Sequence, residues 1–377
     1  MKKITLLLTT IVLAGAVVSC TRSESEPSSL TGLKKRGSMD LKYAEMFSVD
    51  YYENDLALVT VGNNEQYMIV PEDSDIPQGI PDSVTVIRQP ADNIYLAASS
   101  AMDLFSGIGA LDAVSLTSTA EKDWSQPEVR EALSKGEILY AGKYSAPDYE
   151  LIVDRECDLA VESTMIYHSP EIREQLEKMG IPVIVERSSY ESHPLGRMEW
   201  IKLYGLLTGK EDEAANFFDE KTKAVDEFSG DANTGKTAAF FCITSNGFVN
   251  IHKPGDYVSK MIELAGGQNA FTSDDLNVDD NSLSTMNIQF ESFYDFAKDA
   301  DFLIYNSAID GGISSVDELI GKNNLLADFK AVKNGNVWCT EKNMFQQTTG
   351  AADMIADMHL IFTEITDKEP SYIYHLE

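Results

Sequence analysis

The chain has 377 residues, of which 61 are acidic and 30 are basic, so its formal net charge at pH 7 is −31. A surface of this sign repels phosphate backbones, which argues against nucleic acid as a partner. The length exceeds what a single hydrophobic core usually holds, so we expect two domains.

The N-terminus has the pattern of a secretory signal peptide. Two lysines precede an apolar run over residues 4–18, which is too short for a membrane-spanning helix. The run closes with Ser19 and Cys20, and a cysteine directly after a small residue resembles the lipobox of bacterial lipoproteins. We therefore expect a lipoprotein signal peptide over residues 1–19 and lipidation of Cys20. The alternative is an ordinary secretory signal followed by an incidental cysteine.

The residues after the signal peptide have the composition of a tether. They are rich in Ser, Glu and Lys, so a flexible segment over residues 20–39 is expected to hold a folded body away from the membrane. The body has no second apolar run long enough to span a bilayer. Its three further cysteines lack CxxC spacing and are expected to be buried thiols: Cys157, Cys242 and Cys339.

Strands and helices alternate through the first half of the body. The expected strand and helix pairs are 93–97 with 99–105, 113–116 with 128–134, 138–140 with 147–153, 158–161 with 170–179, and 182–185 with 195–207. This alternation predicts a mostly parallel sheet with helices on both faces. Before it, the alternating segments 56–61 and 66–70, joined by a turn at 62–64, predict an additional hairpin of no assigned purpose.

An amphipathic helix over residues 210–228 separates this half from a second one, since its apolar positions recur at helical spacing. The alternation then resumes, with strands at 237–244, 302–305 and 337–340 and helices at 257–264, 290–297, 319–329 and 351–364. We predict two doubly wound α/β lobes joined by a single long helix, with a ligand cleft between the lobes. The expected boundaries are 40–208 for the first lobe, 209–230 for the interlobe helix and 231–377 for the second lobe.

The loops that follow the expected strands form the candidate site, because ligands of open α/β sheets bind beyond the carboxyl ends of the strands. These loops mix hydroxyl, Tyr, Met and His side chains, which suits a large and partly aromatic ligand. The candidate ligand-binding residues are Ser99, Ser100, Tyr144, Thr164, Met165, Tyr167, His168, Arg187, Tyr190, Asn246, His252 and Met344. Met165, Tyr167 and His168 belong to types that ligate iron; the alternative is a packed methionine and a surface histidine.

Catalytic patterns are missing from the sequence, which has no GxSxG, no P-loop and no HExxH. The acidic stretch 275–280 lacks the glycine of a calcium loop and has Met286 at the position of its bidentate glutamate. We therefore predict neither catalytic residues nor an intrinsic metal site, and we do not expect an enzyme.

Six segments carry a family resemblance through their order along the chain: the lipobox at Cys20 and residues 144–150, 157–161, 180–185, 209–214 and 300–304. Together they resemble the substrate-binding proteins of ABC importers for ferric siderophores, haem and cobalamin, the class with a rigid interlobe helix. The resemblance covers nearly all of the mature chain. It implies a monomeric, lipid-anchored protein in the periplasm or on the outer face of the membrane. Such a protein delivers its ligand to an ABC permease dimer with its ATPase, and the iron or cobalt is carried by the ligand.

The same family docks to its permease through one glutamate on each lobe. Glu150 and Glu291 occupy the matching places, each near the start of an expected helix. The alternative is that these acids only interact favourably with the helix dipole.

Two other functional classes stay open: a surface sensor or sequestering lipoprotein, and a chelatase-like enzyme. The identity of the ligand is open as well. Only Arg187 and Arg197 lie near the expected cleft, which is few for an anionic catecholate siderophore, and the Tyr, Met and His content leaves haem and cobalamin possible.

Overall fold

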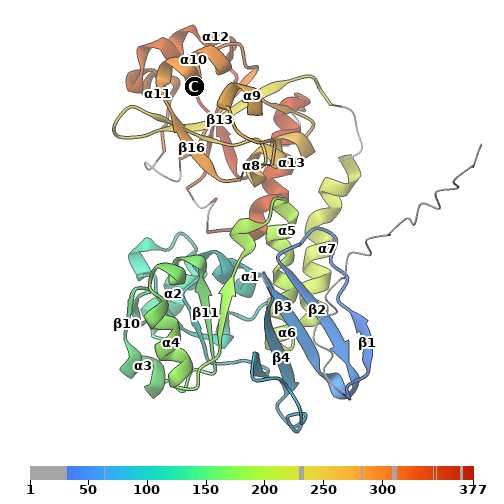
Figure 1. Cartoon of the computed structure of the whole chain (residues 1–377). Coiled ribbons are helices and arrows are strands. Elements are labelled where there is room, and N and C mark those ends of the chain that lie inside the picture. The colour runs from blue at the N-terminus through green and yellow to red at the C-terminus, as the bar shows by residue number, and fades with distance from the viewer. Residues whose placement is uncertain are drawn as a thin grey trace, which may run out of the picture.

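The computed structural model describes residues 32–62, 64–228, 233–281, 283–307, 312–342, 344, 346–365 and 368–377. The expected signal peptide, the lipidation site Cys20 and most of the expected tether lie outside these residues. Within them, no helix is both long and apolar enough to cross a membrane. Figure 1 shows one α/β body above another, with a further sheet beside the lower one.

The first lobe is built on a parallel five-stranded sheet in the order β12-β11-β6-β7-β8. The strands are β6 (Ile94–Leu96), β7 (Val114–Thr117), β8 (Leu139–Tyr140), β11 (Leu159–Ser163) and β12 (Val183–Glu186). The helices are α1 (Met102–Gly107), α2 (Pro127–Lys135), α3 (Tyr149–Asp154) and α4 (Pro170–Lys178). Most strand side chains are buried on both faces, which is typical of a parallel sheet covered by helices. The predicted alternation is confirmed for this lobe.

The second lobe is built on a mixed sheet in the order β16-β14-β13-β17-β18-β19, with β15 also pairing with β13. The strands are β13 (Thr237–Ile243), β14 (Val249–His252), β15 (Gln268–Asn269), β16 (Thr285–Ile288), β17 (Phe302–Tyr305), β18 (Val337–Thr340) and β19 (Ile373–His375). The helices are α8 (Tyr257–Leu264), α9 (Ser273–Leu276), α10 (Phe290–Ala297), α11 (Val316–Lys322), α12 (Lys330–Asn334) and α13 (Ala351–Phe362). The expected helix at 319–329 is instead α11 followed by a short 3₁₀ turn at Asn324–Asp328.

Three helices stand between β12 and β13 in chain order: α5 (Pro194–Glu199), α6 (Ile201–Thr208) and α7 (Glu211–Phe228). Gly209 ends α6 in the left-handed conformation, with φ of 69°. Gly205 lets α7 approach closely, because a Cβ atom there would lie 2.6 Å from the Cβ of Ala214. One hydrophobic cluster continues from the first sheet through these helices to α8 and α13, so the two lobes share a core.

A third sheet, the N-terminal sheet, has the order β1-β2-β3-β4-β5. Its strands are β1 (Lys35–Ser38), β2 (Phe47–Tyr52), β3 (Ala57–Val61), β4 (Glu65–Pro71) and β5 (Val84–Gln89). The predicted hairpin is confirmed as the antiparallel pair β3 and β4, and β5 joins β4 in parallel. Since β1 falls inside the range 20–39, regular structure begins earlier than the expected tether allows.

The segment between β1 and β2 crosses α5 and is held there by two buried carboxylates; we call residues 42–46 the strap. Glu199 accepts hydrogen bonds from three successive backbone N–H groups of the strap, at 2.8–2.9 Å. Glu191 accepts two more, at 2.9 and 3.0 Å. Gly196 faces the same segment, and a Cβ there would lie 2.8 Å from the carbonyl oxygen of Tyr43. Each buried carboxylate is thus satisfied by several donors, as burial of a charge requires.

Candidate functional site

The carboxyl ends of the first sheet gather most of the first-lobe residues that the sequence selects. A 3₁₀ turn after β6 holds Ser99 and Ser100, another after β11 spans Thr164–His168, and a third at Ser188–Tyr190 follows β12. Tyr144 lies in the short hairpin that follows β8. Because neighbouring parallel strands end at the same edge of a sheet, these side chains share one edge. The remaining members of this group are Met165, Tyr167, His168 and Arg187.

The two flanks of this edge carry bulky side chains. Tyr140 ends β8 on one flank, whereas Met165, Tyr167 and Tyr190 follow β11 and β12 on the other, and each of the four is 43–47% exposed. The flanking strands β8 and β12 are four strand spacings apart, or roughly 19 Å. The central strands β6 and β7 are followed by small side chains: Ser99, Ser100, Ser118 and Thr119. Exposed large apolar side chains that gather in this way mark a contact surface.

Tyr167 and Arg187, which follow β11 and β12 on the same flank, contact each other directly. Arg187 donates a hydrogen bond from Nη2 to the phenol oxygen of Tyr167 at 2.5 Å. The guanidinium carbon of Arg187 also lies 5.4 Å from the centre of the Tyr167 ring, within range of a cation–π interaction. The sequence selects both residues separately, and the fold brings them together.

The second-lobe candidates do not form an equivalent cluster. Asn246 is exposed in the turn between β13 and β14, and Met344 is half-buried after β18. The expectation that His252 belongs to a cleft loop is wrong, because His252 lies in β14 and is only 5% exposed. Its Nδ1 lies 2.6 Å from Oδ1 of Asp256. Burial opposes ionisation of Asp256, but the contact with His252 holds the pKa of that carboxyl below its usual value.

Polar contacts between the lobes involve residues that the sequence analysis misses. The side-chain oxygen of Gln346 accepts hydrogen bonds from the backbone N–H and the hydroxyl of Ser125, at 2.7 and 2.6 Å. Asp103 accepts from the backbone N–H of Thr349 at 2.7 Å and from the side chain of Gln126 at 3.2 Å. These residues are scattered through the chain without a shared motif, so no local pattern could have identified them.

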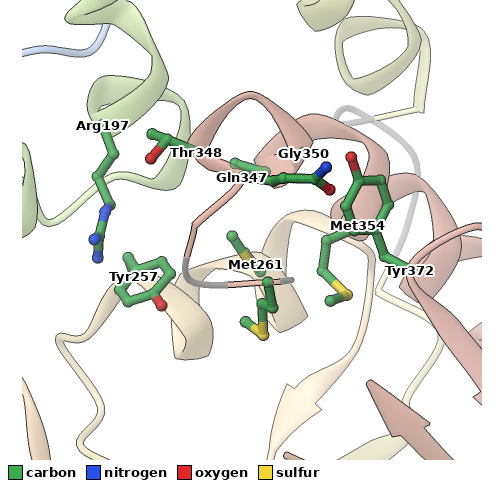
Figure 2. Close-up of a pocket in the computed structure, with 10 residues that line it drawn as sticks. Arg197, Tyr257, Met261, Gln347, Thr348, Gly350, Met354 and Tyr372 are labelled. Atoms are coloured by element: carbon green, nitrogen blue, oxygen red, sulfur yellow. The ribbon is translucent and has the colours of Figure 1, made fainter. Parts of the chain in front are cut away.

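A small cavity lies between α5, α8 and α13 (Figure 2). Arg197 reaches down from α5 over Tyr257, with its guanidinium carbon 3.9 Å from the ring centre, and Met261 and Met354 lie beyond them. Met344 is the one residue of the predicted set that lines this cavity. The cavity has a volume of about 30 Å³, which is room for about one water molecule. Any larger ligand therefore needs the surrounding side chains or the lobes to move apart.

Glu162 lies in β11, behind the edge just described, and is fully buried. Neither of its carboxylate oxygens has a hydrogen-bond partner among the described residues. Burial raises the pKa of Glu162 to about 8. The folded protein therefore keeps this carboxyl protonated at pH values where an unfolded chain has already released the proton.

This carboxyl makes the stability of the protein dependent on pH. Between about pH 4.5 and 8 the folded state holds one more proton than the unfolded state, so the free energy of unfolding falls as pH rises through that window. We expect Glu162→Gln to remove this dependence and to be more stable than the wild type near pH 8, by on the order of 3 kcal/mol. Urea unfolding of the wild type and of Glu162→Gln at pH 5, 6.5 and 8 measures the free energy of unfolding on which this prediction depends. As a control, Glu220→Gln changes a glutamate that is exposed on α7, and it should leave the pH dependence of stability intact. Parallel pH profiles of stability for the wild type and Glu162→Gln would contradict the role assigned to Glu162.

The two glutamates selected for docking are exposed on different lobes. Glu150 lies in the first turn of α3, and Glu291 lies in the first turn of α10. Each therefore presents a negative charge to solvent from the N-terminal end of a helix, where the helix dipole favours it.

Comparisons with known proteins agree with this architecture. The family model described as periplasmic binding protein matches residues 94–344. An uncharacterised lipoprotein of Methanocaldococcus jannaschii is 22% identical over 375 residues, covering 90% of this chain and 86% of the relative.

The fold is also similar to that of solved binding proteins. The petrobactin-binding protein of Bacillus subtilis matches with a TM-score of 0.59 at 15% identity, over 84% of this chain and 100% of that one. The periplasmic haem-binding protein of Vibrio cholerae matches with a TM-score of 0.56 at 17% identity, over 70% and 96% of the two chains. The vitamin B12-binding protein of the same organism matches with a TM-score of 0.51 at 14% identity, over 74% and 99%.

The family match covers more than half of the chain and includes the first sheet and most of the second. The prediction that the chain is not an enzyme is confirmed by this match, because the family is one of binding proteins. The chain belongs to the periplasmic binding protein family.

Proposed function

We propose that this protein is the extracytoplasmic, lipid-anchored substrate-binding component of an ABC importer, and that its cargo is an iron chelate, haem or a corrinoid. The metal travels with the cargo, so the protein itself needs no resident iron or cobalt. Relatives that are named lipoproteins support the anchor at Cys20. Solved proteins of similar fold that are named for haem, petrobactin and vitamin B12 support the range of cargo.

The observation that carries this proposal is the edge of the first sheet. Its bulky, exposed flanks stand roughly 19 Å apart, and its centre is lined by small hydroxyl side chains. Such an edge suits a broad ligand with an apolar or aromatic body, which packs against Tyr140 on one side and Tyr190 on the other. The hydroxyl groups in the centre, including Ser99 and Ser100, supply hydrogen bonds that orient it.

The helices between the lobes favour small movements on binding. We propose that α7 acts as a single stiff connector, because a continuous helix of this length resists bending. It packs against α6 and α13, and the shared hydrophobic cluster resists wide separation of the lobes. Rocking of one lobe against the other, with exchange of the contacts made by Gln346, is then the expected opening motion.

The test is a binding screen of the purified protein against haemin, cyanocobalamin, a ferric hydroxamate and a ferric catecholate. A ligand at a hundredfold excess over its Kd stabilises the folded state by about 2.7 kcal/mol, so one member of the panel should raise the melting temperature. Absorbance spectra recorded with haemin report whether a side chain such as Met165, Tyr167 or His168 binds the iron. Melting temperatures unchanged by all four ligands would contradict the proposed cargo class.

A further inference from the structure

We propose that the N-terminal sheet is part of the ligand-binding apparatus, and that Glu65 is a positioning residue that fixes Tyr167 and Arg187 at the edge of the first sheet. This inference rests on the proposed function, because it takes this edge to be the surface that binds the cargo. It assigns a role to the sheet of β1–β5, which lies outside the residues matched by the family model.

Glu65 begins β4, and its carboxylate reaches the candidate site. Oε1 accepts a hydrogen bond from the Tyr167 hydroxyl at 3.2 Å and lies 3.8 Å from Nη2 of Arg187. That same Nη2 donates to the phenol oxygen of Tyr167. The three side chains therefore form a closed triangle in which the tyrosine is both donor and acceptor. Two of its members follow β11 and β12, and the third comes from the added sheet, 102 residues before Tyr167.

The carboxylate of Glu65 is itself held in place. Its Oε2 lies 3.0 Å from Nη1 of Arg173 on α4 and accepts a hydrogen bond from the Tyr67 hydroxyl at 3.0 Å. Tyr67 is 1% exposed, and its hydroxyl oxygen also lies 2.9 Å from the carbonyl oxygen of Val183 in β12, so its single hydroxyl proton is shared between these two acceptors. An isolated surface ion pair contributes little, but a network of charges with fixed geometry restricts its members.

The turn between β3 and β4 is shaped around Arg187. Gly62 has φ of 53°, and a Cβ atom there would lie 2.5 Å from Nε of Arg187 and 2.7 Å from its Cδ. The arginine side chain therefore crosses directly over this glycine, and only 16% of it is exposed. The added sheet thus contacts Arg187 both through its turn and through Glu65.

This arrangement lowers the loss of side-chain conformational entropy that accompanies ligand binding at the edge. Long side chains on surface loops lose rotamer freedom when they contact a ligand, and residues that are already fixed avoid that loss. Tyr167 is nearly half exposed and yet hydrogen-bonded on both sides, so it presents its ring in one orientation. Glu65 supplies that restriction without being among the large exposed side chains of the edge itself.

The first experiment needs no ligand. The protein is labelled with 3-fluorotyrosine, and the ¹⁹F resonance of Tyr167 is identified by its loss in Tyr167→Phe. Burial and then the charge of Glu65 raise the pKa of Tyr167. Glu65→Ala should therefore shift this resonance and lower the pKa of Tyr167. Glu65→Gln also removes the charge and should lower the pKa as well, but it keeps an acceptor for the Tyr167 hydroxyl and should shift the resonance less. Glu53→Ala, at an exposed glutamate in the turn that joins β2 and β3 of the same sheet, is the matched control. An unchanged Tyr167 resonance in Glu65→Ala overturns the positioning role.

The second experiment measures the Kd of whichever of haemin, cyanocobalamin, ferric hydroxamate and ferric catecholate binds the wild type. Glu65→Ala should weaken that affinity by about tenfold, through lost preorganisation, with Glu53→Ala unchanged. An unchanged affinity combined with a shifted Tyr167 resonance overturns the binding role. If none of the four ligands binds the wild type, the proposed function fails, and the resonance still decides whether Glu65 positions Tyr167.

Discussion

Replacing Glu199 by alanine is expected to lower the free energy of unfolding by about 3–5 kcal/mol. This carboxylate is fully buried and accepts hydrogen bonds from the backbone N–H groups of Lys42, Tyr43 and Ala44. It also lies 2.7 Å from the ammonium group of Lys202, whose side chain is 11% exposed. Its removal leaves three backbone donors without their acceptor and a nearly buried cation without this anionic partner, although Lys202 still donates to the carbonyl oxygen of Asp40. Urea unfolding followed by circular dichroism measures the loss.

The control for this prediction separates the acceptor from the bulk of the side chain. Glu199→Gln retains an amide oxygen for part of the strap and should cost less than the alanine substitution. Gly196→Ala tests the same contact from the other side, since its new Cβ would press on the carbonyl oxygen of Tyr43. A Glu199→Ala protein as stable as the wild type would show that the contact between Glu199 and the strap contributes nothing to stability.

The double substitution of Glu150 and Glu291 by alanine is expected to abolish uptake while leaving ligand affinity unchanged. Both carboxylates are exposed and lie in first turns of helices on different lobes. A two-fold permease that presents basic pockets would engage one glutamate of each lobe, and loss of both removes this electrostatic complementarity. Ligand binding by the purified variant and uptake by cells that depend on the protein measure the two parts separately.

A matched pair of acids tests whether position matters rather than charge. Glu128 and Asp317 are also exposed in first turns of helices, α2 of the first lobe and α11 of the second. Replacing both by alanine changes the net charge by the same amount, and uptake should be retained. Wild-type uptake by the Glu150 and Glu291 double variant would remove the docking role from these residues.

Much of the secondary structure was predictable because it depends on local pattern. The helix at 290–297 and the strand at 302–305 are each bounded as expected, since the charged segment 298–301 separates two apolar patterns and can be recognised from a few residues. The antiparallel strands β14 and β16 were missed. The strand β16 pairs with β14 far along the chain, and β14 itself, which pairs with β13 across a short turn, lies in a segment expected to be a loop. His252 was misplaced for that reason, as a residue of β14 rather than of a loop.

The sequence by itself determined the α/β alternation, the hairpin of β3 and β4 and the loops that form the edge of the first sheet. These features follow from hydrophobic periodicity and turn residues, which act over short distances along the chain. The tertiary structure alone decided which polar side chains meet. Glu199 binds the strap across 157 residues of sequence, and Glu65 meets Tyr167 across 102. A glutamate that binds a distant backbone or a distant phenol has no local signature, because its partner is set by how the sheets and helices pack.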